Sequence, residues 1–325
     1  MSRRFRRRPL AGLAALVGLG LLAAGCSGGG GSAAPGGLEK TNLVVAAVPA
    51  MDSAGLYIAK NRGYFAAEGL NVTILKATSG GTAINGQLAG QFDVTVGNYV
   101  SYISKNATDP KADFKVLAAG SIMQSANQEI LVPAHSHITT VAGLKGKSIA
   151  VNVKGNIGTL LVDSVLTDNA VQVDNNQFVP IPFPQMATAM AQHRVDAAWM
   201  PEPFVTQAEE DTGAVPLADS NQGSSQNLPI AGYMVTGAWL KKNPNTAAAF
   251  RAAVLKGQAV AATNPGAVQQ GMEKFAGTSQ QVAAIANDPE FPTQQNAVLL
   301  GRLASLMLNF GMLPQAYNVN KMIVK

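Results

Sequence analysis

Cysteine, histidine and charged residues are scarce in this sequence. The 325 residues include one cysteine and three histidines, and charged residues make up 13% of the chain. A single cysteine has no partner within the chain for a disulfide, and the histidines and cysteine are not clustered in the sequence as the ligands of a metal site would be. There is no Gly-x-Ser-x-Gly nucleophile turn, no phosphate-binding P-loop and no dinucleotide fingerprint. The sequence therefore predicts no catalytic residues, no metal and no other cofactor.

The net charge of +5 originates in the first nine residues. They carry five of the 24 lysines and arginines and no acid, which leaves 19 basic residues against 19 acidic ones in the rest of the chain. That remainder contains no arginine-rich run, no ladder of stacking aromatics and no zinc knuckle. These absences exclude nucleic-acid binding.

The N-terminal residues have the pattern of an export signal. The arginines are followed by an uncharged apolar run over residues 10–25, which is shorter than the ~20 residues that a membrane-spanning helix needs. No later segment has eighteen consecutive apolar residues. We expect residues 1–25 to be a signal peptide and the chain to be exported.

The apolar run ends at the only cysteine. Leu22 to Cys26 read Leu-Ala-Ala-Gly-Cys and resemble a bacterial lipobox, whose cysteine is lipidated and becomes the new N-terminus. The alternative is an ordinary signal-peptidase site beside a chance cysteine. Residues 26–39 are rich in glycine and serine, which suits a flexible tether. We expect a lipid anchor on Cys26 that holds the protein at the cell membrane, on its extracytoplasmic face.

From residue 41, short β-branched runs alternate with amphipathic stretches, which is typical of parallel α/β units. The sequence predicts strands at residues 43–48, 72–76, 94–96, 115–118, 129–132, 148–151, 178–181, 197–200 and 232–236. It predicts helices at residues 53–61, 82–89, 99–105, 158–167 and 186–193. Residues 220–229 are expected to form a loop, and the C-terminal part is expected to be helical.

Two helices of the C-terminal part have recognisable ends. Asn243 and Pro244 favour a helix start, with the asparagine side chain as cap and proline at the first helical position. The apolar residues of the last helix repeat at helical spacing, and Gly311 is placed to terminate it.

Two stretches of the sequence share a pattern. In both, a helix leads through a polar turn to an aspartate and then to a small apolar strand, around Asp93 and around Asp196. The repetition suggests two similar lobes, each with its own small sheet. Because both aspartates stand at the start of a strand, we expect them to have structural roles.

Four segments resemble one known family. They are "GLYIAKNRGYFAAEGLNVTI", "GGTAINGQLAGQFDVTVGN", "TVAGLKGKSIAV" and "VDAAWMPEPF". In this order they are similar to the solute-binding proteins of nitrate, sulfonate and taurine importers and of thiamine-pyrimidine importers. The resemblance implies an α/β fold of the periplasmic-binding-protein type (type II), with two lobes that each contain a small helix-flanked sheet and are joined by crossing strands.

The resemblance also implies a division of the chain and a function. Lobe 1 would comprise residues 40–125 and 228–325, and lobe 2 would comprise residues 126–227. A monomeric receptor of this kind would capture a small-molecule solute between its lobes and deliver it to the permease of an ABC transporter. The crossing segments near residues 120–127 and 221–230 would be its hinges.

Polar loops follow the predicted strands. In open α/β sheets, ligands bind beyond the carboxyl ends of the strands and at helix N-termini. The candidate solute-binding residues in these positions are Asp52, Ser53, Ser79, Gly80, Gly81, Thr82, Asn98, Tyr99, Asn152, Asn156 and Glu202. The alternatives are helix caps or turn residues for the small polar side chains, a core position for Tyr99, and a helix N-terminal acid for Glu202.

The candidate loops contain no arginine, so backbone N–H groups, hydroxyls and amides would have to hold an oxoanion. Sulfonate, nitrate or taurine is the first solute class. A carboxylate at Glu202 would suit an amino group, and a thiamine-type aminopyrimidine is the alternative. The third reading is an enzyme of pyrimidine biosynthesis on the same fold. It would need clustered histidines and cysteines, whereas His135 and His137 lie in a turn-like stretch.

Overall fold

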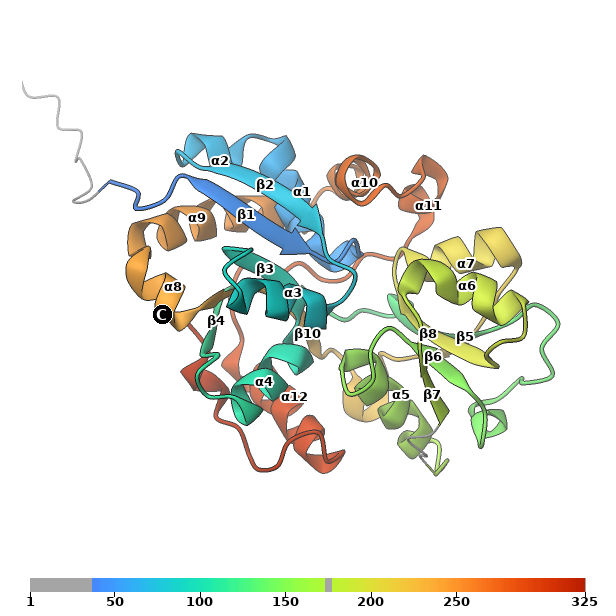
Figure 1. Ribbon diagram of the computed structural model, residues 1–325. Helices are drawn as coiled ribbons and strands as arrows, with labels where there is room; N and C mark the ends of the chain where they lie inside the picture. The colour runs from blue at the N-terminus through green and yellow to red at the C-terminus, as the bar shows by residue number, and fades with distance from the viewer. Residues whose placement is uncertain (1–36, 173–176, 325) are drawn as a thin grey trace, which may run out of the picture. The chain divides into compact units, whose positions relative to one another are not determined.

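The computed structural model describes residues 37–172 and 177–324, which contain two five-stranded sheets flanked by helices (Figure 1). Cys26 and the predicted signal peptide lie outside the described residues. Sheet A has the strand order β2-β1-β3-β10-β4, and sheet B has the order β7-β6-β8-β5-β9. In each sheet three neighbouring strands are parallel and one internal strand, β10 or β5, is antiparallel to both its neighbours. The predicted α/β class is confirmed.

The strands divide between the sheets as follows. Sheet A contains β1 (Asn42–Ala47), β2 (Asn71–Lys76), β3 (Val94–Asn98), β4 (Phe114–Ile122) and β10 (Pro229–Thr236). Sheet B contains β5 (Gln128–Val132), β6 (Ile149–Val151), β7 (Phe178–Pro180), β8 (Ala197–Pro201) and β9 (Val215–Asp219).

Twelve α-helices occur in the described residues. The helices that follow strands of sheet A along the chain are α1 (Ala54–Asn61), α2 (Tyr64–Ala67), α3 (Gly80–Leu88), α4 (Tyr99–Thr108), α8 (Gly237–Lys242), α9 (Pro244–Ala261), α10 (Pro265–Gly271), α11 (Gln280–Ile285) and α12 (Ala297–Asn309). Those of sheet B are α5 (Ile157–Asp168), α6 (Phe183–Ala191) and α7 (Phe204–Thr212). Single turns η1 (Met51–Ser53), η2 (Val141–Leu144), η4 (Gly223–Ser225), η5 (Met272–Ala276) and η6 (Val319–Lys321) complete the description.

The sequence analysis predicts every strand except β9. That strand is at the edge of sheet B and contains Pro216. Proline cannot donate to a sheet ladder and is tolerated at an edge, so the pattern of this segment does not indicate a strand. The predicted asparagine cap of α9 is wrong: Asn243 precedes the helix, but its amide donates to the carbonyl of Trp239 instead. Gly311 follows α12 with a φ of 69°, as expected.

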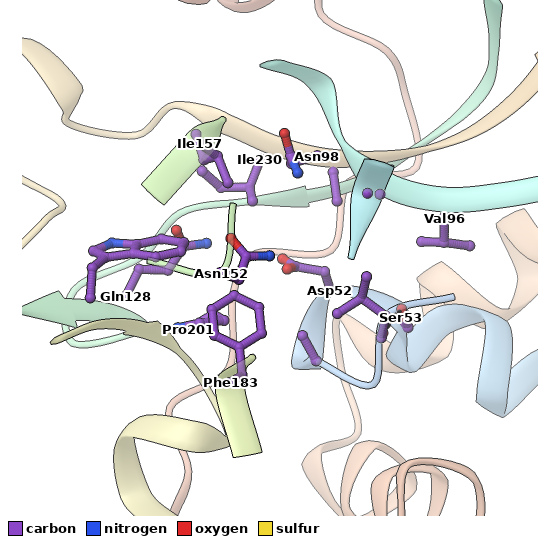
Figure 2. Close-up of a pocket in the computed structure, with 16 residues that line it drawn as sticks. Asp52, Ser53, Val96, Asn98, Gln128, Asn152, Ile157, Phe183, Pro201 and Ile230 are labelled. Carbon is purple, nitrogen blue, oxygen red and sulfur yellow. Dashed lines mark hydrogen bonds between the residues drawn. The ribbon is translucent and has the colours of Figure 1, made fainter. Parts of the chain in front are cut away.

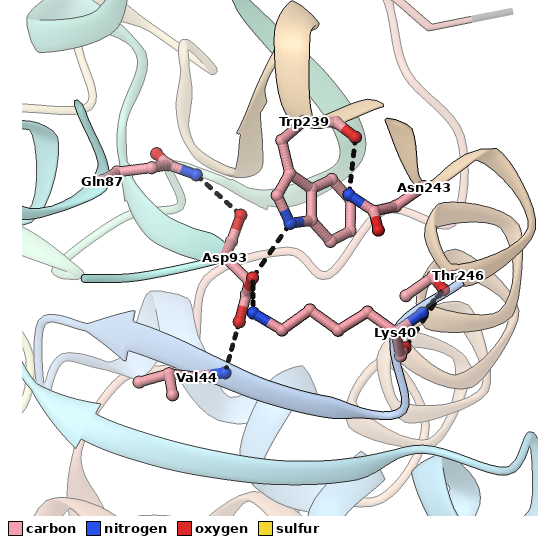
Figure 3. A network of polar contacts seen from close by, with 7 residues as sticks. All are labelled: Lys40, Val44, Gln87, Asp93, Trp239, Asn243 and Thr246. Carbon is pink, nitrogen blue, oxygen red and sulfur yellow. Dashed lines mark hydrogen bonds and ion pairs between the residues drawn. The ribbon is translucent and has the colours of Figure 1, made fainter. Parts of the chain in front are cut away.

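The two predicted structural aspartates have equivalent places in the two sheets. Asp93 accepts a hydrogen bond from the backbone N–H of Val44 at 2.9 Å, and Asp196 accepts one from the backbone N–H of Ser148 at 2.8 Å. Figure 3 shows that Asp93 also binds the ammonium of Lys40 and the indole N–H of Trp239. Each aspartate fastens the start of its strand to the neighbouring parallel strand, which explains the repeated sequence pattern.

Apolar side chains form two large clusters. One contains β1 and β3 residues with α1 and α9, around Tyr57, Phe65 and Phe250. The other runs from α4 and α12 on the opposite face of sheet A into sheet B, where Trp199 is buried. The described helices include none with the length and hydropathy of a membrane span.

Three segments link the two sheets. Residues 123–127 connect β4 to β5, and residues 220–228 connect β9 to β10. A third contact comes from the segment after α11: the backbone N–H of Asn287 donates to Glu202 at 3.1 Å, and its carbonyl accepts from the amide of Asn127 at 2.9 Å. The lobe boundaries at residues 125/126 and 227/228 stay a prediction.

Candidate functional site

A cavity of about 40 Å³ is lined by residues of both sheets (Figure 2). It is larger than a single water molecule needs but far below the ~300 Å³ at which drug-sized pockets begin. In this conformation it therefore suits a solute of few atoms. Its lining consists of Val48, Ala50, Asp52, Ser53, Gly80, Val96, Gly97, Asn98, Gln128, Asn152, Ile157, Phe183, Trp199, Pro201, Ile230 and Ala231.

The lining residues lie where strand ends from both sheets meet. Asp52 follows β1, Asn98 ends β3, Asn152 follows β6 and Pro201 ends β8. These are the carboxyl ends of parallel strands, as the sequence analysis expects. Five of the eleven candidate residues line the cavity: Asp52, Ser53, Gly80, Asn98 and Asn152.

Asp52 is the only charged residue in the lining that the structure describes. The hydroxyl of Ser121 donates a hydrogen bond to its carboxylate. Burial raises the pKa of Asp52 from its ordinary value near 3.8 to about 6, against the opposing effect of that hydrogen bond. Since no lysine, arginine or histidine lines the described cavity, the carboxylate is available to a hydrogen-bond donor or a cation.

Two asparagine side chains of the lining have amide nitrogens that bind none of the described residues. The Oδ1 atom of Asn98 accepts hydrogen bonds from the backbone N–H and the hydroxyl of Ser101 at 3.0 and 3.1 Å. The Oδ1 atom of Asn152 accepts one from the amide of Asn156 at 2.8 Å. With the oxygens engaged, the NH₂ groups remain as donors to a bound molecule. Figure 2 shows the amide of Asn152 directed toward Asp52.

Four candidate residues lie outside the lining but next to residues that belong to it. Ser79 and Thr82 form a capping box at the start of α3, and Gly81 lies between them outside the lining. Asn156 caps α5 through the backbone N–H of Gly158 at 3.1 Å and positions Asn152. Ser79, Thr82 and Asn156 are therefore helix-capping residues, which is the alternative that the sequence analysis gives for small polar side chains.

Tyr99 and Glu202 lie away from the cavity. Tyr99 is 2% exposed and packs against Gly232, where even a Cβ atom would lie 2.5 Å from its hydroxyl. The carboxylate of Glu202 accepts hydrogen bonds from Thr206 and from the backbone of Asn287. Burial raises the pKa of Glu202, and these hydrogen bonds oppose that shift. The sequence places both residues after a strand but does not say that each side chain turns inward.

The sequence analysis misses Gln128, Ile230 and the aromatic wall of Phe183 and Trp199. Gln128 and Ile230 stand near the starts of β5 and β10. Both strands are antiparallel to their neighbours, so their N-terminal ends lie beside the carboxyl ends of β8 and β3. The expectation that ligands bind beyond the carboxyl ends of strands concerns residues that follow a strand. It does not point to residues at the start of an antiparallel strand.

All three histidines line another, surface cavity of about 250 Å³. His135, His137 and His193 share it with Lys147 and Asp196. Nowhere in residues 37–172 and 177–324 are three histidine, cysteine, aspartate or glutamate side chains arranged to hold a metal ion. The carboxylate of Asp196 is engaged by Ser148.

Known proteins similar to this chain are mostly binding proteins. The NMT1/THI5 like family model matches residues 50–268, about two thirds of the chain. Over 210 residues the chain is 26% identical to the candidate binding protein YtlA of Bacillus subtilis (strain 168), a match that covers 63% of the chain and 61% of YtlA.

Solved structures of similar fold include two binding proteins and an enzyme. The alkanesulfonate-binding protein SsuA from Xanthomonas axonopodis pv. citri, bound to MOPS, is 17% identical with a TM-score of 0.75, covering 89% of this chain and 99% of its own. The periplasmic nitrate-binding protein NrtA from Synechocystis PCC 6803 is 16% identical with a TM-score of 0.75, covering 89% and 87%. The desulfurization enzyme DSZB is 16% identical with a TM-score of 0.66, covering 88% and 96%. The periplasmic-binding-protein-like fold predicted from the sequence is thereby confirmed.

Proposed function

Because the chain belongs to the NMT1/THI5-like family, we propose that it is the extracytoplasmic solute-binding receptor of an ABC uptake system. Its lobes, residues 40–125 with 228–325 and residues 126–227, close on a small polar solute and present it to the permease. The observation that carries the proposal is the small cavity to which both sheets contribute polar side chains at their strand ends. Closure would remove water from the solute and bring both sets of contacts together.

The charge of the cavity favours a solute with an amino group. A nitrate or a simple alkanesulfonate would lie beside the carboxylate of Asp52 with no basic side chain in the described lining to balance it. Taurine combines a sulfonate, which the amides of Asn98 and Asn152 can hold, with an ammonium group for Asp52. Within the sulfonate, nitrate and taurine class we therefore propose taurine first.

A specific feature supports a thiamine-type aminopyrimidine as the second candidate. Phe183 and Trp199 line the cavity with their ring centroids 6.0 Å apart, and Phe183 also stacks on Phe204 at 5.2 Å. Aromatic walls suit a flat ring, and the amino group of the pyrimidine could donate to Asp52. Its ring is larger than taurine's two-carbon chain, so the cavity would have to open further to admit it.

We propose a binding protein and not an enzyme. A hydrolase or transferase on this site would need a nucleophile next to an orienting base. The described lining has one carboxylate, three amides and one serine, and that serine donates its hydroxyl to the carbonyl of Val48 at 2.8 Å. The enzyme among the structural neighbours shares the fold, and fold alone does not carry a function.

Thermal unfolding of the purified protein against a solute panel tests this function. The panel pairs each amine with the same skeleton without it: taurine with ethanesulfonate, and 4-aminopyrimidine with pyrimidine, together with nitrate. A solute at a hundred times its dissociation constant adds about 2.7 kcal/mol of stability, which raises the midpoint by roughly 4–5 °C for a protein of this size. We expect an amino member to give this shift and its partner to give none. Shifts from nitrate and ethanesulfonate alone would contradict the amine preference.

We propose further that Cys26 carries the lipid that anchors a monomeric receptor to the cell membrane. The support is the lipobox-like Leu22 to Cys26 and the glycine-rich tether after it. Replacing Cys26 with alanine should move the protein from the membrane fraction to the soluble fraction, while Ser27→Ala, which keeps the cysteine, should leave it on the membrane. Sedimentation of the Cys26→Ala protein with membranes, as for the unchanged protein, would contradict the anchor.

A further inference from the structure

The side chain of Gln128 is buried in the cavity wall without a partner. It is 1% exposed, and its amide oxygen has no hydrogen-bond donor within reach. Among the described residues, none forms a hydrogen bond with either atom of this amide. Buried amides in folded proteins are nearly always paired, because an unpaired one keeps the full cost of leaving water. Exchanging the amide oxygen and nitrogen would still leave the group without a partner among the described residues, but would present a donor where the oxygen now lies.

The backbone fixes the face of sheet B on which the side chain of Gln128 lies. It is the first residue of β5 and lies opposite Pro201 of β8. On the other side its carbonyl accepts a hydrogen bond from the backbone N–H of Ser220 at 2.9 Å. Residues opposite one another in a sheet share a face, as do residues two apart along a strand. Gln128 therefore shares the cavity face with Pro201 and Trp199, and all three belong to the lining.

The other polar groups of the cavity leave a distinct role for this amide. The amide oxygens of Asn98 and Asn152 already accept hydrogen bonds, and the NH₂ groups of these residues are the donors that they offer to a solute. Asp52 is the one charged acceptor in the described lining, and among the three amide oxygens there only that of Gln128 accepts no hydrogen bond. In Figure 2 Gln128, Asn152 and Asp52 follow one another across the view, with Asp52 and Gln128 on opposite sides of Asn152.

We infer that Gln128 is a specificity-determining residue whose amide oxygen accepts an N–H bond from the solute. The solute then carries at least two N–H donors, one for Asp52 and one for Gln128. This inference rests on the proposed function and narrows the solute class to primary amines and amino-heterocycles. A solute with acceptors alone could accept from the amide nitrogen of Gln128 but would leave its amide oxygen as unpaired as it is without solute.

The test compares Gln128→Met with a matched control. Methionine nearly preserves the volume of glutamine and removes the amide. Gln295 offers the control: its amide oxygen is also buried without a partner, but it lies outside the described lining and its nitrogen donates to the carbonyl of Val116 at 2.8 Å. Both variants and the wild type, as full chains purified in detergent, are titrated with taurine, ethanesulfonate, 4-aminopyrimidine and pyrimidine. Tryptophan fluorescence reports binding, because Trp199 is part of the cavity wall.

We expect Gln128→Met to weaken the binding of the amino solute by about 10- to 100-fold, the range for losing a hydrogen bond to a charged or polar group. The affinity of the partner without the amino group should stay unchanged. The unfolding midpoint of the solute-free variant should not fall, because the substitution removes an unpaired buried amide. Gln295→Met should bind every solute as the wild type does.

Two results overturn the inference in different ways. If Gln128→Met binds the amino solute as tightly as the wild type, or loses both members of a pair equally, Gln128 is not a specificity contact, although the proposed receptor function stands. If the wild type binds none of the four solutes, the proposed solute class fails as well. Should Gln128→Met unfold at a lower midpoint, Gln128→Leu is measured in the same way, and loss of discrimination between the members of a pair remains the deciding readout.

Discussion

Asp52 combines two properties that seldom occur together unless a ligand requires them. It lines a cavity, and burial raises the pKa of its carboxyl to about 6 without a basic partner in the described lining. A carboxylate held in this way reduces the stability of the protein and increases its affinity for a donor. At the residue scale, our account of solute recognition depends on Asp52 and Gln128, whose side chains lack a full set of hydrogen-bond partners in the solute-free protein.

Replacing Asp52 with asparagine should stabilise the solute-free protein at neutral pH. The pKa of Asp52 is higher in the folded protein than its ordinary value near 3.8. The raised pKa of Asp52 therefore leaves the free energy of unfolding of the wild type undiminished below pH 4. This free energy falls as the pH rises and is reduced in full once the pH has passed about 6, where the buried carboxyl ionises. The variant lacks this loss, so its free energy of unfolding should exceed that of the wild type at pH 7.5 by up to ~3 kcal/mol. At pH 4 the two should agree.

Urea denaturation of both proteins at pH 4 and pH 7.5 measures this difference. Glu129, Asp163 and Asp288 also have raised pKa values, which burial causes first in each case. They are present in both proteins, so the difference between wild type and variant isolates Asp52. An Asp52→Asn protein that is less stable than the wild type at pH 7.5 would show that the carboxylate has a structural role instead.

The sequence predicts some of the individual residues of the candidate site. Asp52, Asn98 and Asn152 follow parallel strands and do line the cavity. The direction of a side chain in a loop depends on its neighbours, so the sequence cannot tell that Tyr99 turns into the core or that Glu202 turns toward Thr206. Nothing local to Gln128 indicates a binding residue, because its position becomes functional only through the pairing of β5 with β8.

At the scale of elements, the sequence predicts the alternation of strands and helices. It does not predict which strands lie next to one another in a sheet. Hydrophobic runs predict β1 and β3, and the turn residues predict the start of α5 to within one residue, while α3 begins two residues earlier than predicted, at Gly80. The insertion of β10 between β3 and β4, although β10 begins at Pro229 and β4 already ends at Ile122, leaves no local pattern. The long-range pairing nevertheless decides which residues meet, since it brings the start of β10 to the carboxyl end of β3.

For the whole molecule, the relevant feature is a set of hydrogen bonds that join the segments of the two sheets around Glu202. The backbone N–H of Met51 donates to the carbonyl of Glu202 at 3.1 Å, and the segment after α11 binds Glu202 and Asn127. Glu202, which the sequence suggests as a solute contact, thus contributes at the junction between the sheets. We propose that these contacts form when the lobes close, and that residues 123–127 and 220–228 bend to allow it.

Solution X-ray scattering tests most directly whether a solute closes the lobes. The purified protein is measured alone and with the amino solute that raises its unfolding midpoint, and Asp52→Asn at the same solute concentration is the control. The account predicts that the radius of gyration of the wild type decreases on binding, with the mass staying that of a monomer, and that the variant does not change. A solute that binds, as tryptophan fluorescence reports, while the radius of gyration stays the same would contradict capture by closure.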